Sequence, residues 1–151
     1  MQNLEEETLR KALSLLTRRE HSTMELSRKL VAKGIDEDVV NSIISRLYRR
    51  NLLSDTRFTE NFVRQRIANG YGPIRIRHEL RQRGIDEDTI MQFLLHEEDN
   101  WTDRILDVRR KRFGISEPKD YRDRVCQVRF LLYRGFAGEH IRKVLDRINH
   151  D

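Results

Sequence analysis

Arginine side chains are the part of this sequence with the most evident chemistry. Residues 57–83 contain seven arginines against Glu60 and Glu79, a net charge of +5 over the segment. Because the guanidinium group is a planar fork of donors that matches carboxylate and phosphate, such a segment favours an anionic partner. A solvated, salt-bridged helical surface is the alternative interpretation of the same charges. The candidate residues are Arg57, Arg64, Arg66, Arg75, Arg77, Arg81 and Arg83.

Four consecutive cations form a second candidate site. They fall at the end of a helix that is expected to begin near Trp101. One interpretation is that they compensate the partial negative charge of the helix C-terminus, an effect of roughly a few tenths of a kcal/mol per residue. The other is contact with phosphates or with an acidic protein surface. Both interpretations stay open for Arg109, Arg110, Lys111 and Arg112.

Other reactive residue types show no arrangement that would support catalysis or metal binding. The five histidines have no His-x-x-x-His pair and no ordinary zinc spacing. No Gly-x-x-x-x-Gly-Lys-[Ser/Thr] phosphate-binding loop occurs. Cys126 lies beside the apolar stripe of a predicted helix, which indicates a packed thiol. We therefore expect no catalytic residue, no cofactor and no metal ion, and the missing site argues against an enzyme.

The composition favours thin helical modules over one large hydrophobic core. Of 151 residues, 37% are hydrophobic and 36% are charged, whereas charged residues make up about a quarter of a typical soluble domain. The longest apolar run, Phe130–Tyr133, is far shorter than a membrane span. The acidic start does not resemble a signal peptide, and a single cysteine fits a reducing compartment. We therefore expect a cytoplasmic protein without a membrane partner.

An internal repeat organises the chain. The string Gly-Ile-Asp-Glu-Asp occurs at residues 34–38 and again at 84–88, and a weaker copy stands at 135–139. A glycine after a helix can adopt the left-handed conformation that ends the helix, and the apolar residue after it then contacts the last turn. Each copy therefore predicts a helix, a sharp turn and a second helix. The structural glycines are Gly34, Gly84 and Gly135, where valine should distort the turn.

The remaining helices are marked by start signals and by apolar residues at helical spacing. A helix over residues 5–19 comes first. The later starts are a capping box at Ser22–Glu25, Asp36, Asp55 and Asp86 as caps, Gly72 with Pro73 at the first helical position, Trp101, and the segment after Pro118. In the last of these helices the apolar stripe is Tyr121, Val125, Val128 and Leu132.

This pattern predicts an all-α protein with nine helices. No segment shows the sustained alternation of a strand. The helices group into three tandem three-helix repeats, over residues 1–53, 54–98 and 99–151. Because units of about 50 residues are marginal alone, they should stack on their neighbours, and we expect an elongated, curved molecule.

Several of these segments, in this order and spacing, resemble the RecX family, whose members modulate the bacterial RecA recombinase. The matching residues are Asp55-x-Arg57-Phe58, Phe62, Arg66, Gly70-Tyr71-Gly72-Pro73, Arg77, Glu79-Leu80 and Gly84-Ile85. Residues 130–136 are also similar to the ending of the family. The resemblance covers essentially the whole chain and implies the family fold, three tandem three-helix modules.

The resemblance also implies a function. RecX proteins bind RecA filaments on single-stranded DNA, lodge in the helical groove, and inhibit ATP hydrolysis, strand exchange and co-protease activity. This implies a non-catalytic regulator in homologous recombination, DNA repair and the SOS response, without a cofactor. The resemblance fixes no contact residue, so the candidate site consists of the eleven cations named above. No strong heptad seam is visible, and we expect a monomer.

A direct nucleic-acid-binding module is the alternative. A basic helical repeat could hold single- or double-stranded DNA through its phosphates, with little sequence preference and a steep salt dependence. Tyr71 and Trp101 could stack on bases, but isolated aromatic residues at turn and stripe positions are more typical of packed side chains. The sequence leaves open which arginines contact RecA and which contact DNA. It also leaves open end-capping, groove blocking and filament disassembly.

Overall fold

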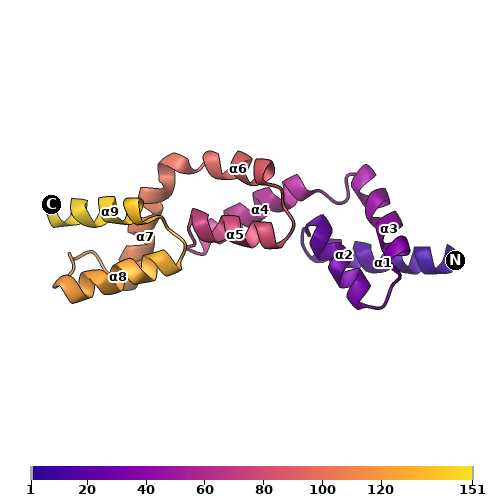
Figure 1. Ribbon diagram of the computed structural model, residues 1–151, viewed down its shortest axis with the longest axis horizontal. Helices are drawn as coiled ribbons and strands as arrows, with labels where there is room; N and C mark the ends of the chain where they lie inside the picture. Colours follow the sequence, from indigo (N-terminus) through magenta and orange to yellow (C-terminus); the bar gives the residue numbers. More distant parts are fainter. Residues whose placement is uncertain (1, 151) are drawn as a thin grey trace. The chain divides into compact units, whose positions relative to one another are not determined.

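The computed structural model describes residues 2–150, and over this range the chain is all-α, as predicted. Nine α-helices and one short 3₁₀ helix, η1, account for its regular structure (Figure 1). The helices are α1 (Gln2–Arg18), α2 (Thr23–Ala32), α3 (Glu37–Arg49), α4 (Asp55–Ala68), α5 (Pro73–Gln82), α6 (Glu87–Leu95), η1 (Glu98–Asn100), α7 (Trp101–Phe113), α8 (Tyr121–Tyr133) and α9 (Gly138–His150). No helix in this range is both long and apolar enough to span a membrane.

The contacts divide the chain into two compact units. The first unit contains the residues up to Phe62 together with Leu80–Thr89. The second unit contains Val63–Glu79 and the residues from Ile90 onward. The division passes through α4 and α5, so the middle predicted repeat contributes to both units. The boundaries of the three predicted repeats stay a prediction.

The core of the first unit lies where α1, α2 and α3 pack against one another. Leu26 and Leu30 of α2 and Val40 and Ile43 of α3 are fully buried there. Partly buried leucines of α1, among them Leu9, pack against this cluster. Burial of each such side chain contributes about 1.5–3 kcal/mol relative to exposure, which is why these short helices persist.

The three repeated glycines end helices in the way the sequence predicts. Their φ angles are +87° at Gly34, +79° at Gly84 and +96° at Gly135, all in the left-handed region. After Gly34, the N–H of Ile35 donates to the carbonyl of Leu30 at 3.4 Å, the hydrogen bond that closes a Schellman ending. The equivalent bonds run from Ile85 to Leu80 and from Phe136 to Leu131.

The helix starts confirm most of the predicted caps and correct one. The capping box of Ser22 and Glu25 forms in both directions, and the carboxylate of Asp86 accepts from the N–H of Thr89. Asp36 occupies its predicted N-cap position without a side-chain hydrogen bond. The prediction for Asp55 was wrong: the hydroxyl of Ser54 accepts from the N–H of Arg57, as a cap does. The Asp55 carboxylate accepts instead from the N–H of Thr23 at 2.7 Å and so joins α4 to the start of α2.

A buried histidine lies next to this contact between α4 and the start of α2. His21 is 1% exposed, its Nδ1 lies 3.1 Å from the carbonyl of Arg19, and its Nε2 lies 2.8 Å from Nζ of Lys29. Because an ammonium group can only donate, the neutral tautomer with the proton on Nδ1 satisfies both contacts. Burial lowers the pKa of His21, and the charges of Arg19 and Lys29 act in the same direction.

This histidine should make the protein less stable in mild acid. An unfolded chain protonates His21 below about pH 6.5, whereas the folded chain resists protonation. The free energy of unfolding should therefore fall as the pH drops below that value, by up to about 1.4 kcal/mol per pH unit. Urea unfolding between pH 7.5 and 5 measures this slope. In His21→Gln the slope should be shallower, while exposed His78→Gln should keep it; an unchanged slope in His21→Gln would contradict the prediction.

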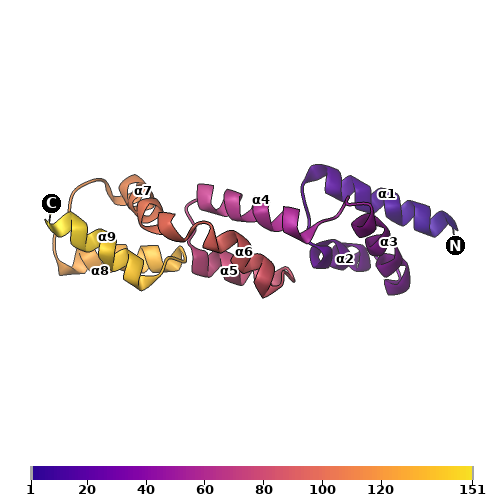
Figure 2. The same cartoon turned by 90° about the horizontal axis from the view of Figure 1, so that it is seen from above.

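In the second unit, α7, α8 and α9 pack against one another, as the two views show (Figures 1 and 2). The predicted stripe of α8 was wrong: Tyr121 is 81% exposed and Leu132 is half-exposed, whereas Gln127 and Leu131 are buried. The inward face is thus rotated, because buried Arg109 of α7 requires Gln127 as a partner. Cys126 consequently faces solvent, so the packed thiol expected from the sequence was also wrong.

Two glycine turns meet in the second unit. The N–H of Gly72 donates to the carbonyl of Arg134 at 2.8 Å, and the N–H of Ile74 donates to the carbonyl of Gly135 at 3.0 Å. A Cβ atom on Gly72 would lie 2.5 Å from the backbone of Gly135, and one on Gly135 would lie 2.3 Å from Cβ of Arg75. Pro73 is the first residue of α5, as predicted. We refer to this contact as the glycine junction.

Candidate functional site

Arg109 must be removed from the predicted basic cluster at the end of α7. Its side chain is 1% exposed. Its Nε donates to Oε1 of Gln127 at 2.8 Å, and its remaining nitrogens donate to the carbonyls of Gly114 and Ser116. Burial lowers the pKa of Arg109, against the opposing charge of Asp123. Arg109 thus holds the α7–α8 loop and cannot meet a partner at the surface.

The other three cations of the cluster are exposed. Arg110 lies 4.0 Å from Asp107, one turn earlier on α7. Arg112 places its guanidinium 5.1 Å from the ring centroid of Phe130. Lys111 and Arg112 have no carboxylate within 4 Å among residues 2–150. These two side chains therefore remain available to an anion.

The seven arginines of residues 57–83 do not form one unpaired basic face. Arg57, Arg81 and Arg83 belong to the first unit, and the other four belong to the second. At least five of them have a carboxylate within 4 Å. The pairs are Arg57–Glu20, Arg83–Glu25, Arg81–Glu87, Arg66–Glu79 and Arg75–Glu79. Three of these four carboxylates lie outside the segment, so its local net charge overstates the charge available to a partner.

α5 nevertheless presents basic side chains opposite its buried face. Ile76 and Leu80 are fully buried, and Arg81 on the opposite side is exposed. Arg77 is half-buried, and Arg64 of α4 is exposed. Arg81 is 52% exposed even with its ion pair to Glu87 at 2.9 Å. An exposed pair of this kind contributes little to folding, about 0–1 kcal/mol, so Arg81 can exchange Glu87 for a partner's acid.

Tyr71 lies at the centre of an arginine–tyrosine cluster in the second unit. The guanidinium carbons of Arg75, Arg134 and Arg66 lie 4.3, 5.0 and 5.3 Å from its ring centroid. Arg75 also lies 5.4 Å from the ring of Tyr133, which is 75% exposed. The hydrogen bond to Glu79 raises the pKa of Arg75. The cluster combines planar cations and an exposed ring, the two features that bind single-stranded nucleic acid.

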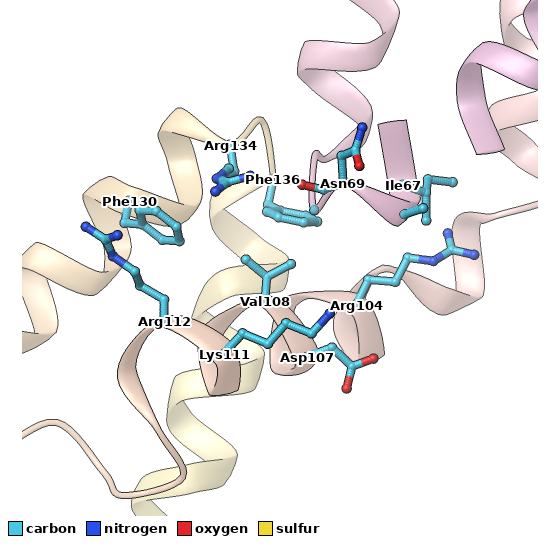
Figure 3. A pocket seen from close by; sticks show the side chains of 12 residues that line it. Ile67, Asn69, Arg104, Asp107, Val108, Lys111, Arg112, Phe130, Arg134 and Phe136 are labelled. Atoms are coloured by element: carbon cyan, nitrogen blue, oxygen red, sulfur yellow. Dashed lines mark hydrogen bonds between the residues drawn. The ribbon is translucent and has the colours of Figure 1, made fainter. Parts of the chain in front are cut away.

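A pocket of about 470 Å³ lies beside this cluster, lined by the end of α4, by α7 and by the α8–α9 turn (Figure 3). Its apolar wall includes Ile67, Val108 and Phe136. Four cations line it against one carboxylate: Arg104, Lys111, Arg112 and Arg134 against Asp107. We refer to it as the basic pocket.

Several residues of this region were not predicted. Arg104 received no functional role from the sequence, and Phe130 and Arg134 were covered only by the segment 130–136 that resembles the ending of the family. Trp101 is 1% exposed, which confirms that it is packed. Tyr71 is half-buried among arginines. The sequence signal that could have found Arg134 is the arginine or lysine that stands before each of the three repeated glycines. The contacts of Arg134, however, depend on the glycine junction.

The part of the chain that the structure describes contains no cluster of three or more metal-binding side chains. The exposed Cys126 is likewise outside any such group.

Comparison with known proteins assigns a family to all three parts of the chain. A model described as the first three-helix domain of RecX matches residues 9–47. The models for the second and third RecX domains match residues 54–94 and 98–145.

Curated relatives and solved structures agree with these matches. The regulatory protein RecX of Pseudomonas putida KT2440 is 44% identical over 136 residues, which cover 90% of this chain and 87% of the relative. The RecX protein of Legionella pneumophila strain Corby is 44% identical over 137 residues, 91% of each chain. The crystal structure of RecX from Lactobacillus salivarius matches with a TM-score of 0.85 at 21% identity and covers both chains completely. At that identity the structural match shows the fold alone.

Proposed function

Because the chain belongs to the RecX family of regulatory proteins, we propose that it binds RecA filaments on single-stranded DNA and inhibits them. The inhibited activities are ATP hydrolysis, strand exchange and co-protease cleavage. The observation that carries the proposal is the ordered match of all three family domains over most of the chain. The protein acts in the cytoplasm as a monomer and by binding, without catalysis or a cofactor.

The proposed contacts come from cations that the structure leaves accessible. Arg64, Arg77 and Arg81 on α4 and α5 and Arg110, Lys111 and Arg112 on α7 meet acidic RecA surface or DNA phosphate. Arg57, Arg66, Arg75 and Arg83 are secondary candidates, because each is half-buried in its ion pair. Arg81, in contrast, is exposed in its pair with Glu87. Binding in the helical groove of the filament would let one molecule contact neighbouring RecA protomers, and so oppose the changes that accompany ATP hydrolysis.

The first test is DNA-dependent ATP hydrolysis by RecA, titrated with this protein. We expect inhibition that requires the assembled filament. Arg77→Ala with Arg81→Ala should raise the half-inhibitory concentration about tenfold, equivalent to about 1.4 kcal/mol of lost binding. The control is Arg49→Ala with Arg50→Ala, an exposed pair at the end of α3 with the same change of charge. Unaltered inhibition by a folded Arg77/Arg81 variant would remove α5 from the interface.

Direct binding to nucleic acid is the second candidate function. The exposed ring of Tyr133 beside Arg75 favours it, since stacking on an aromatic side chain holds unpaired bases. Titration of labelled single- and double-stranded DNA without RecA separates the two functions. Tight binding with a steep salt dependence, together with no effect on RecA, would replace the first proposal with this one.

A further inference from the structure

We propose that the basic pocket binds a nucleoside phosphate, with the phosphate against Lys111 and Arg112 and the base against the apolar wall. Lys111 and Arg112 also belong to the proposed contacts with RecA or DNA, but neither the family nor that action assigns a small-molecule ligand to the pocket that they line. The inference goes beyond the proposed function, because it concerns a ligand of the free protein.

The first argument is the distribution of charge around the pocket. Arg104 pairs with Glu97, and Asp107 lies beside Arg110. Lys111 and Arg112 are exposed and adjacent, without a carboxylate within 4 Å among the described residues. In Figure 3, Lys111 extends toward Arg104 and Arg112 turns toward Phe130. Their charged ends point apart in Figure 3. Because the four-carbon stem of lysine is flexible, Lys111 can turn from Arg104 toward Arg112, and the two uncompensated cations then match a dianion.

The second argument is the orientation of the arginines. Arg112 and Arg134 each place the guanidinium carbon 5.1 Å from the ring centroid of Phe130. Arg134 is fixed further by a 3.0 Å hydrogen bond to the carbonyl of Asn69. A guanidinium held over an aromatic ring keeps its edge for hydrogen bonding, and that edge binds phosphate in a bidentate manner.

The third argument is the shape and polarity of the interior. Val108 points toward Phe136 (Figure 3). Ile67 and Ala68 also line the pocket and add to its apolar wall. The volume of about 470 Å³ lies in the range of small-molecule sites, about 300–1,000 Å³. An apolar wall beside two available cations suits a flat base joined to a phosphate. Inorganic phosphate would leave the wall unused.

An acidic peptide is the competing ligand, and the apolar wall disfavours it. Two of its carboxylates could compensate both cations, but glutamate side chains offer no flat ring to the wall of Ile67, Val108 and Phe136. A terminal phosphate carries about −1.5 to −2 at neutral pH, which matches both cations. The same chemistry has two sources, a free nucleotide and the 5′-phosphorylated end of a DNA strand.

The single tryptophan provides the readout. The ring of Trp101 lies 6.3 Å from that of Phe136, and Arg104 lies 5.0 Å from the Trp101 ring. Since Phe136 and Arg104 both line the pocket, a ligand there should change the emission of Trp101. The probe is adenosine 5′-monophosphate, titrated in the absence of RecA, with adenosine, inorganic phosphate and a glutamate-rich peptide as comparisons.

We expect saturable binding of adenosine 5′-monophosphate, at least tenfold tighter than that of adenosine or phosphate alone. Lys111→Gln with Arg112→Gln should weaken it at least tenfold. The matched control is Arg142→Gln with Lys143→Gln, an adjacent exposed pair on α9 that does not line the pocket. An oligonucleotide with a 5′-phosphate distinguishes the sources: tighter binding than the mononucleotide assigns the pocket to a strand end, and weaker binding assigns it to a free nucleotide.

Three results would overturn the proposal. They are no binding of the mononucleotide, equal loss in the control variant, and binding of the glutamate-rich peptide alone. Inhibition of RecA by the Lys111/Arg112 variant is measured in parallel. If the unchanged protein inhibits RecA normally but does not bind the nucleotide, the pocket proposal is rejected and the proposed function stands.

Discussion

Gly72→Ala should destabilise the second unit by about 3 kcal/mol or more, far beyond the usual effect of one methyl group. The new Cβ would lie 2.5 Å from the carbonyl carbon and oxygen of Gly135, a distance that forces the two turns apart. Separation would break the hydrogen bonds from Gly72 to Arg134 and from Ile74 to Gly135. Each buried group left unpaired costs about 1–3 kcal/mol.

Gly34→Ala is the matched control for this prediction. Gly34 has a φ of +87° but no atom within 4 Å of a new Cβ. Its substitution should therefore introduce only the left-handed strain of about 1–2 kcal/mol. Urea unfolding followed by Trp101 emission, which reports on the second unit, should show a much larger loss for Gly72→Ala. The unfolding of Gly34→Ala is followed by far-ultraviolet circular dichroism. A smaller loss of stability for Gly72→Ala than for Gly34→Ala would contradict the structure of the glycine junction.

These two glycines show why the sequence predicted one feature of the fold and missed the other. The helix endings at Gly34, Gly84 and Gly135 depend on residues within six positions, so a local pattern suffices to predict them. The glycine junction depends on two turns that are remote in sequence. Nothing around Gly70-Tyr71-Gly72-Pro73 distinguishes a turn that contacts another backbone from a turn that only begins a helix.

The candidate site, like the fold, could be predicted from the sequence only in part. Counting charges over residues 57–83 found arginines that include Arg81, but it could not find their acidic partners. Glu20 approaches from the loop between α1 and α2, Glu25 from α2 and Glu87 from α6. The rotation of α8 was missed because its apolar residues, Val125 and Val128 among them, allow more than one inward face. Buried polar partners such as Gln127 decide between these faces, and polar residues carry no such signal in a hydrophobic pattern.

Arg109→Met should lower the stability of the protein by about 3 kcal/mol, whereas Arg110→Met should leave it within about 0.5 kcal/mol. Methionine keeps much of the apolar stem of Arg109 but leaves Gln127 and the carbonyls of Gly114 and Ser116 without their donor. Hydrogen bonds to a charged group contribute about 1.5–3 kcal/mol each, and the loop can recover part of this through water. For a chain of this size the loss corresponds to a fall in Tm of about 6–12 °C.

Arg109→Lys tests whether charge or geometry carries this effect. Lysine retains the positive charge but lacks the planar fork that reaches three acceptors, so it should recover only part of the loss. Thermal unfolding gives the stability, and amide hydrogen exchange over residues 114–120 should accelerate in Arg109→Met and not in Arg110→Met. Equal stability of these two variants would return Arg109 to the surface cluster with Arg110, Lys111 and Arg112. A selective loss instead separates one structural arginine from three neighbours that remain available to a partner, a division that four consecutive basic residues do not reveal.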